Sequence, residues 1–241
     1  MVSVCMATYN GSLFLKKQID SILCQLCADD ELIISDDSST DDTLKIIESY
    51  NDKRIKVLYH QREKSKYYPK MSVPYASFNF ENALKEAKGD YIFLSDQDDI
   101  WLPSKIKECT ELLKQYDYVL TNLSIIDEQD NIVCKKMYSK KPFTRNIIKN
   151  CFHPIFWGCC ACFTQKILQA SLPFPKSTCL HDFWIGLVAT KTGTMFWFDK
   201  PLVLHRVGSQ NTSTGGKKSN NSLWMKFLYR FYAFFEYIKL K

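Results

Sequence analysis

The sequence has no uninterrupted apolar run of the roughly 18 residues that a membrane-spanning helix needs. It also has neither a Gly-x4-Gly-Lys loop nor a Gly-x-Gly-x-x-Gly turn, so no glycine-rich backbone is available to cradle phosphates. No run of Lys and Arg with interleaved aromatic residues resembles a nucleic-acid-binding module. The apolar start at residues 2–6 lacks the charged flank and longer apolar run of a secretory signal. We therefore expect no spanning helix, no signal peptide and no nucleic acid partner.

The cysteine pattern does not indicate a disulfide scaffold. Ten cysteines are present, but several stand inside apolar segments, where a thiol behaves as a small hydrophobic side chain. Cys24 and Cys27 have the spacing of a redox or zinc pair, yet no second pair or nearby His completes a tetrahedral set. A chain of 241 residues with 46% hydrophobic content can bury a core without covalent staples. These features predict a globular protein of the reducing cytoplasm, and its net charge of +6 suits phosphate-bearing substrates or an anionic membrane surface.

Strand-like and helix-like segments alternate in the first half of the chain. Short apolar runs predict strands at residues 2–7, 31–35, 55–59 and 91–95. Apolar residues at helical spacing predict helices at 15–26 and 78–88, with another beginning near Asp41 and Asp42. This alternation implies crossover connections and a parallel sheet. Residues 60–76 show no periodicity and are predicted to form a long loop.

The second half has a less regular pattern. Helices are predicted at 103–115, at 165–170 and from His181 onward. Strands are predicted at 118–122, 132–138, 194–199 and 202–207. Residues 208–222 are rich in Gly, Ser and Asn and are predicted to be flexible.

The last segment, residues 223–241, is predicted to be an amphipathic helix. One face carries five apolar side chains, namely Trp224, Phe227, Leu228, Phe231 and Phe235, and the basic residues lie away from its centre. Two interpretations remain open. The helix either lies on an anionic membrane or packs on the domain or on a second subunit.

Polar clusters directly follow three of the predicted strands. They are Thr8, Tyr9 and Asn10; Asp36 and Asp37; and Asp96 to Asp99. In an open parallel sheet, ligands bind at the carboxyl ends of the strands, so we expect the clusters to share one cleft. Neighbouring carboxylates repel one another unless a cation lies among them, and hard divalent cations prefer oxygen ligands. The pattern predicts a Mg²⁺ or Mn²⁺ site that holds a diphosphate; the alternative for the third cluster is an acidic turn capping the helix near Pro103.

At this point the chain resembles the family 2 glycosyltransferases of GT-A fold, and within them the rhamnosyltransferase-like group. Four motifs carry the resemblance, which covers residues 1–215: Val4-Cys5-Met6-Ala7-Thr8-Tyr9-Asn10-Gly11, Ser35-Asp36-Asp37-Ser38-Ser39-Thr40-Asp41, Gly89 to Trp101 with Ser95-Asp96-Gln97-Asp98-Asp99, and His181-Asp182-Phe183-Trp184. The resemblance implies an α/β, Rossmann-like mixed and mainly parallel sheet flanked by helices. Residues 1–102 would bind the nucleotide sugar and 103–215 the acceptor, followed by a linker and helix at 216–241.

The resemblance also implies roles for the strand-end residues. Thr8, Tyr9 and Asn10 would line the base and ribose pocket, and Asp36 or Asp37 would accept a hydrogen bond from a pyrimidine N–H. Asp96-Gln97-Asp98 matches the DxD element of the family. Asp98 would bind the metal directly, with Asp96 near the ribose and the metal-bound waters. From the sequence itself, we expect Asp99 to be structural, capping the turn toward Pro103.

Asp182 matches the catalytic base of the family, which deprotonates the acceptor hydroxyl. Burial beside Phe183 and Trp184 is expected to raise its pKa toward a useful value. The alternative for Asp182 is a helix N-cap.

The chain departs from the family pattern in two places. Where many relatives have Tyr-Arg-x-His, it has His205-Arg206-Val207-Gly208, so Arg206 would contact the diphosphate and His205 would stand in as a metal ligand. At residues 79–83 the Arg that relatives often carry near the nucleotide is missing. We then expect the positive charge near the nucleotide to come from Arg62, Lys64 or Lys66.

The resemblance implies a cytoplasmic, metal-dependent, inverting glycosyltransferase, with peripheral contact to the inner face of the membrane through residues 223–241. It would move a sugar from a UDP or dTDP donor to a glycan or lipid-linked acceptor in surface polysaccharide biosynthesis. The sequence is compatible with an oligomer. Two other functions stay open. One is a nucleotide-sugar pyrophosphatase or nucleotidyltransferase, and the other is a catalytically silent binding or assembly subunit.

Overall fold

The computed structural model describes residues 1–62, 64–68, 73–144, 146–152, 156–178, 180–208 and 222–240. The linker predicted at 208–222 lies almost wholly outside these ranges. In the first half the predicted alternation is observed, with helices that end earlier than their periodicity indicated: β1 (Val2–Thr8), α1 (Leu15–Leu23), β2 (Glu31–Asp36), α2 (Thr43–Glu48), β3 (Ile55–Tyr59), α3 (Val73–Leu84) and β4 (Tyr91–Ser95).

The second half contains short strands between helices, and a 3₁₀ turn called η1. Its elements are β5 (Ile100–Trp101), α4 (Lys105–Leu113), β6 (Tyr118–Ile126), β7 (Ile132–Cys134), α5 (Ile147–Phe152), η1 (Gly158–Cys160), β8 (Ala161–Thr164), α6 (Gln165–Ser171), α7 (His181–Thr192), β9 (Met195–Arg206) and α8 (Leu223–Lys239).

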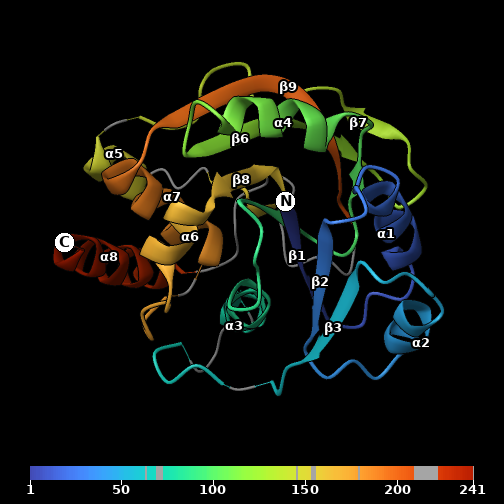
Figure 1. Ribbon diagram of the computed structural model, residues 1–241. Helices are drawn as coiled ribbons and strands as arrows, with labels where there is room; N and C mark the ends of the chain where they lie inside the picture. The colour runs from blue at the N-terminus through green and yellow to red at the C-terminus, as the bar shows by residue number, and fades with distance from the viewer. Residues whose placement is uncertain are drawn as a thin grey trace.

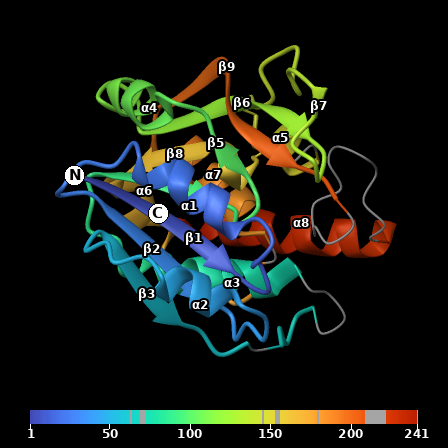
Figure 2. The same ribbon diagram turned by 90° about the vertical axis from the view of Figure 1, so that its right-hand side faces the viewer.

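Nine strands of the described residues form one sheet, in the order β3-β2-β1-β4-β8-β6-β9-β5, with β7 beside β6. β1 pairs in parallel with β2 and β4, and β2 pairs in parallel with β3. Figure 2 shows β1, β2 and β3 side by side and running in the same direction. β8 is antiparallel to β4 and β6, whereas β6 and β9 are parallel. The predicted α/β class with a mixed sheet is confirmed.

The strands of the second half differ from the prediction. The strands expected at 194–199 and 202–207 are one strand, β9, whose register against β6 shifts beside Pro201. Proline lacks an N–H group, so it interrupts the hydrogen-bond ladder without ending the strand. The strand expected at 132–138 is limited to the three residues of β7. β5 and β8 had no sequence signal of their own.

The packing of the helices explains the hydrophobic pattern. All nine residues of β6 are buried. The strand lies between β8 and β9 in the sheet, and α4 and η1 also contact it. α1 and α2 lie on one side of the strands β1 to β3, and α3 lies on the other side (Figure 1). The carboxyl ends of β1, β2 and β4 therefore meet at one edge between these layers.

Helix α8 packs against α5 and α7 at the edge of the domain (Figure 1). Tyr229 is buried, with its ring 6.5 Å from that of Phe183. The structure thus shows α8 packed on the domain, which was one of the two interpretations of this helix. Much of its aromatic face nevertheless remains exposed. None of the helices in the described ranges combines the length and apolarity needed to cross a membrane.

Candidate active site

The ends of β1 and β2 are joined by a network around Asp36. The Thr8 hydroxyl donates to Asp36 Oδ1 at 3.0 Å, and the Ser39 N–H donates to Asp36 Oδ2 at 2.8 Å. The Ser39 hydroxyl also donates to Asp36 and accepts from the N–H of Asn10, a residue with a φ of 48°. Both oxygens of the buried Asp36 are therefore engaged in shaping the loop.

Asp37 faces a different set of side chains. Its Oδ1 lies 2.7 Å from His60 Nδ1, and its Oδ2 lies 3.7 Å from Arg62 Nε. The Arg62 guanidinium is sandwiched between two rings, 3.8 Å from the centroid of Tyr9 and 4.2 Å from that of Tyr75. Asp37 Oδ2 is thus less engaged than either oxygen of Asp36. Of the three basic residues expected to help, the structure brings Arg62 to the predicted base pocket.

Gln97, the middle residue of the Asp96-Gln97-Asp98 motif, binds the end of β1. Its side chain accepts from the Tyr9 N–H at 2.8 Å and donates to the Tyr9 carbonyl at 3.0 Å. Gly11 makes this approach possible, since a Cβ atom there would lie 2.3 Å from Gln97 Oε1. The first and third polar clusters therefore meet, as predicted.

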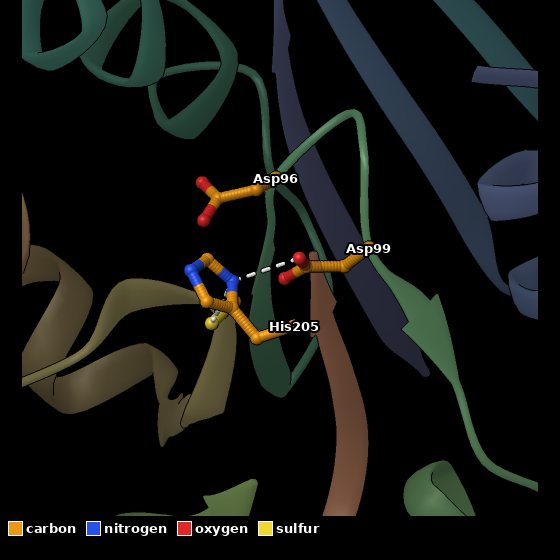
Figure 3. A group of neighbouring side chains, drawn as sticks. Asp96, Asp99 and His205 are labelled. Carbon is orange, nitrogen blue, oxygen red and sulfur yellow. Dashed lines mark hydrogen bonds and ion pairs between the residues drawn. The ribbon is translucent and has the colours of Figure 1, made fainter. Parts of the chain in front are cut away.

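The ends of β4 and β9 bring together a group of potential metal ligands. One ligand atom from each of Asp96, Asp99, Cys159 and His205 lies within 4.8 Å of the other three. The carboxylates of Asp96 and Asp99 are turned toward the His205 ring (Figure 3), and His205 Nδ1 is 2.8 Å from Asp99 Oδ1. Asp99 Oδ2 is buried and meets no hydrogen-bond partner among the described residues. Carboxylate, imidazole and an unpartnered oxygen fit a divalent cation.

This group differs from two of the expected assignments, those of Asp98 and Asp99. Asp99 belongs to it, where Asp98 was expected, and Asp99 does not cap the turn toward Pro103: its Oδ1 instead accepts from the backbone N–H of Arg206 at 3.1 Å. His205 is in the group, as expected.

Arg206 does not have the free guanidinium that a diphosphate contact requires. Its side chain is fully buried, and its Nε and Nη1 donate to the backbone carbonyls of Asp98 at 2.9 Å and Asp127 at 2.8 Å. Its Nη2 forms an ion pair with Asp130 at 2.6 Å. The sequence pattern could not reveal this, because the direction of the side chain depends on the neighbouring loop. Arg206 therefore holds the acidic loop in position.

The carboxylates are crowded enough to perturb one another. Burial and the charges of Asp99 and Asp98 raise the pKa of Asp96 well above its ordinary value. Burial and the charge of Asp99 raise the pKa of Asp98 to about 6. Burial lowers the pKa of His205, but the charge and hydrogen bond of Asp99 outweigh it, so that this pKa rises to about 9. A cation among these groups would relieve the repulsion.

Asp182 lies in the first turn of α7, beside the acidic group. Its Oδ2 accepts from the Gly158 N–H at 3.3 Å and its Oδ1 from the Phe183 N–H at 2.7 Å. Its charge adds to those that raise the pKa of Asp96. Burial raises the pKa of Asp182 itself to about 6. The N-cap residue of α7 is Leu180, so Asp182 does not occupy the capping position that was its alternative.

Comparison with known proteins identifies the family. The model of a family described as Glycosyl transferase family 2 matches residues 3–172. The chain belongs to glycosyl transferase family 2. The glucosyltransferase WfgD of Escherichia coli, named for UDP-Glc and a GlcNAc-diphosphoundecaprenol acceptor, is 30% identical over 73% of this chain and 64% of its own length. The dTDP-rhamnosyl transferase RfbG of Shigella flexneri is 28% identical over 86% of this chain and 72% of its own.

Solved structures confirm the predicted GT-A fold. S. aureus TarS 1-349 in complex with UDP-GlcNAc has a TM-score of 0.66 at 18% identity, covering 90% of this chain and 61% of that one. Mannosyltransferase PcManGT from Pyrobaculum calidifontis, in complex with GDP-Man and Mn²⁺, has a TM-score of 0.60 at 19% identity, covering 87% and 58%. The chain thus spans less than two thirds of WfgD and of both solved chains.

The sequence analysis gave five residues of the site either no role or a role that differs from their place in the structure. They are His60, Tyr75, Gln97, Asp99 and Cys159. Gln97 and Asp99 stand inside the acidic motif, which was a sufficient signal to include them. His60, Tyr75 and Cys159 come from other segments, and the fold alone brings them to the strand ends.

Proposed function

We propose that the protein is a metal-dependent, inverting glycosyltransferase. It moves a sugar from a UDP or dTDP donor to a glycan or lipid-linked acceptor in surface polysaccharide biosynthesis. The observation that carries this proposal is the placement of a half-buried carboxylate, Asp182, beside the ligand group that contains Asp96 and Asp99. The names of WfgD and RfbG, with UDP-Glc and dTDP-rhamnose as donors, support this choice of nucleotides.

The donor base is placed at the ends of β1 and β2. Tyr9, which is 41% exposed, offers a ring face for the base once the Arg62 guanidinium moves off it. Asp37 accepts the pyrimidine N–H, because its Oδ2 is held only by the long ion pair with Arg62. We assign Thr8 and Asn10 to the ribose side of the pocket, and this is supported by the hydrogen bonds through which they fix the loop.

The reacting end of the donor lies between the ligand group and Asp182. A Mg²⁺ or Mn²⁺ ion held by Asp96, Asp99 and His205 would neutralise the charge of the diphosphate leaving group. Asp182 takes the proton of the acceptor hydroxyl as this oxygen attacks the anomeric carbon from the face opposite the diphosphate. Attack from that face inverts the configuration. The raised pKa of Asp182 makes it a stronger base than an exposed Asp.

The test is a donor panel with purified protein. UDP- and dTDP-linked sugars are incubated with Mn²⁺, and the release of nucleoside diphosphate is measured. We expect slow donor hydrolysis that stops on metal removal and falls in Asp96→Asn and in Asp182→Asn. The control is Asp199→Asn, whose carboxylate pairs with Lys136 on the exposed surface.

The three open functions give different products in this assay. Release of a nucleoside monophosphate that survives Asp182→Asn would identify a pyrophosphatase or nucleotidyltransferase instead. Tight binding of UDP without turnover of any donor would identify a silent subunit. Each result would overturn the proposed transfer reaction.

We further propose that the exposed face of α8 lies on an anionic lipid surface, on the cytoplasmic side of the membrane. Trp224, Phe227, Phe231 and Phe235 remain 43–68% exposed although the helix packs on the domain. The helix carries three basic residues and one acidic residue, which favours anionic lipid. All nine cysteines of the described ranges are free thiols, in keeping with a reducing compartment.

A further inference from the structure

The ligand group at the ends of β4 and β9 contains a sulfur atom. Cys159 Sγ lies 3.9 Å from His205 Nδ1, and both belong to the group whose ligand atoms lie within 4.8 Å of one another. Cys159 is 1% exposed and stands in η1, far along the chain from the acidic motif. Oxygen and nitrogen ligands suit Mg²⁺ and Mn²⁺, whereas a thiolate selects softer cations. The sulfur therefore changes what the site can bind.

The group has features of a ligand site beyond a cluster of acids. Asp99 Oδ2 is fully buried and lacks a hydrogen-bond partner among the described residues, although buried oxygens are normally satisfied. Two ligand atoms on one ion are separated by at most about 4.5 Å, the sum of two metal–ligand bond lengths. The observed limit of 4.8 Å is close to this value. A small contraction around an ion would bring the four atoms into coordination.

The backbone around Cys159 is firmly held. The buried Lys105 ammonium donates to the Cys159 carbonyl at 3.1 Å, and the Cys160 N–H donates to the Trp157 carbonyl at 3.0 Å. The Trp157 ring stands edge-on to His205 at 5.0 Å. Rigid support of this kind keeps ligands in place before the ion arrives. By contrast, Cys162 is equally buried but directs its thiol to the Val119 carbonyl at 3.6 Å, outside the group.

We propose that Cys159 is a sulfur ligand of the cation bound by Asp96, Asp99 and His205. The site then binds Co²⁺, Zn²⁺ and Cd²⁺ more tightly than a site with the same oxygen and nitrogen ligands alone. On binding, the Cys159 thiol and the His205 imidazolium each lose a proton to solvent, and the thiolate and the neutral imidazole coordinate the ion without any change of oxidation state. This inference rests on the metal dependence in the proposed function and adds to it a choice among cations.

The test is a Co²⁺ titration of the full chain followed by absorption spectroscopy. A sulfur ligand gives a thiolate-to-cobalt charge-transfer band in the near ultraviolet. We expect this band in the unaltered protein and in the control Cys162→Ser. In Cys159→Ser and Cys159→Ala the band disappears, while the visible cobalt bands show that the ion still binds. In a competition assay the preference for Cd²⁺ over Mn²⁺ should fall about tenfold or more in Cys159→Ser.

The outcomes separate this inference from the proposed function. Bound Co²⁺ without a thiolate band, or a band that survives both Cys159 variants, overturns the role of Cys159 and leaves the metal-dependent reaction intact. A protein that binds neither Co²⁺ nor Mn²⁺ overturns both. Thermal unfolding of each variant without metal shows whether it folds, and the two Cys159 variants guard against misfolding of either one.

Discussion

The Gln97 side chain forms hydrogen bonds with both backbone groups of Tyr9, accepting from its N–H at 2.8 Å and donating to its carbonyl at 3.0 Å. This pair of bonds joins Tyr9, proposed to offer a ring face to the donor base, with the loop that carries the proposed metal ligands Asp96 and Asp99. Because both bonds go to main-chain atoms, they fix the position of the strand end whatever the side chain of Tyr9 does. If the proposed function holds, base binding and metal binding are therefore mechanically connected.

Replacing Gln97 should separate these two parts of the site. In Gln97→Ala, kcat/KM for the donor should fall about 30-fold, since two hydrogen bonds worth about 1 kcal/mol each are lost. Gln97→Glu should lose more, because its carboxylate would face the Tyr9 carbonyl. Steady-state kinetics with the active donor measure both. Gln115→Ala, at an exposed position in the turn after α4, is the control. Unchanged kinetics in Gln97→Glu would contradict the coupling.

The pH dependence should report Asp182. A general base must be deprotonated, so activity is present above its folded-state pKa and is lost as the pH falls through about 6. An unperturbed Asp would move this limb to about 4. The measurement is kcat/KM against pH at saturating Mn²⁺. Asp98 also has a pKa of about 6, so Mn²⁺ binding must be measured over the same pH range.

The variant Asp182→Asn assigns that limb. We expect kcat to fall at least about 100-fold, because a general base contributes that much or more. The control is Asp42→Asn, at the start of α2, whose carboxylate pairs with Lys45 on the surface. If Asp182 acts only on the helix dipole, both variants would lose about 0.5 kcal/mol of stability and no activity.

Arg206 should be needed for both stability and catalysis. In Arg206→Lys a single ammonium cannot reach the Asp98 carbonyl, the Asp127 carbonyl and Asp130 together, so the free energy of unfolding should fall by about 3 kcal/mol. Loss of the Asp98 anchor should also lower kcat/KM in the protein that remains folded. Urea unfolding and kinetics measure the two effects.

Arg54→Lys is a matched control for this substitution. Arg54 also binds two carbonyls, those of Leu23 and Leu26, and one carboxylate, that of Asp52, but it is 20% exposed and lies away from the site. We expect a smaller loss of stability and unchanged kcat/KM. Equal kinetics in the two variants would refute the positioning role of Arg206.

The sequence predicted the parallel half of the sheet well, because its strands are short, mainly apolar runs and three of the four end at a polar cluster. β8 could not be predicted in the same way. Its four residues, Ala161–Thr164, lie between β4 and β6, and only this tertiary pairing makes them a strand. The sequence predicted two strands in place of β9, because Pro201 lacks the N–H group that a continuous strand would use. The sequence does not show that a shift in the register between β6 and β9 lets the strand continue past this proline.

The same distinction applies to the site. The acidic motif predicted a metal site. It could not tell which of Asp98 and Asp99 belongs to that site, because the two are chemically identical neighbours. Which of them faces His205 depends on the path of the loop, and Arg206 fixes that path through the Asp98 carbonyl. Cys159 looked like any buried thiol in an apolar segment. Its proximity to His205 arises only when η1 packs beside β4 and β9.

The exposed aromatic face of α8 should govern binding to anionic vesicles. Phe227→Ser with Phe231→Ser removes two exposed rings without touching the buried Tyr229, so partitioning should fall at least about tenfold while unfolding is unchanged. Flotation with phosphatidylserine vesicles measures this, and binding should weaken with added salt because the basic residues contribute. Tyr59→Ser, which removes a 69% exposed ring from β3, should leave partitioning unaltered. If the double variant floats as well as the unaltered protein, or if loss of the rings instead splits an oligomer, the helix serves another surface.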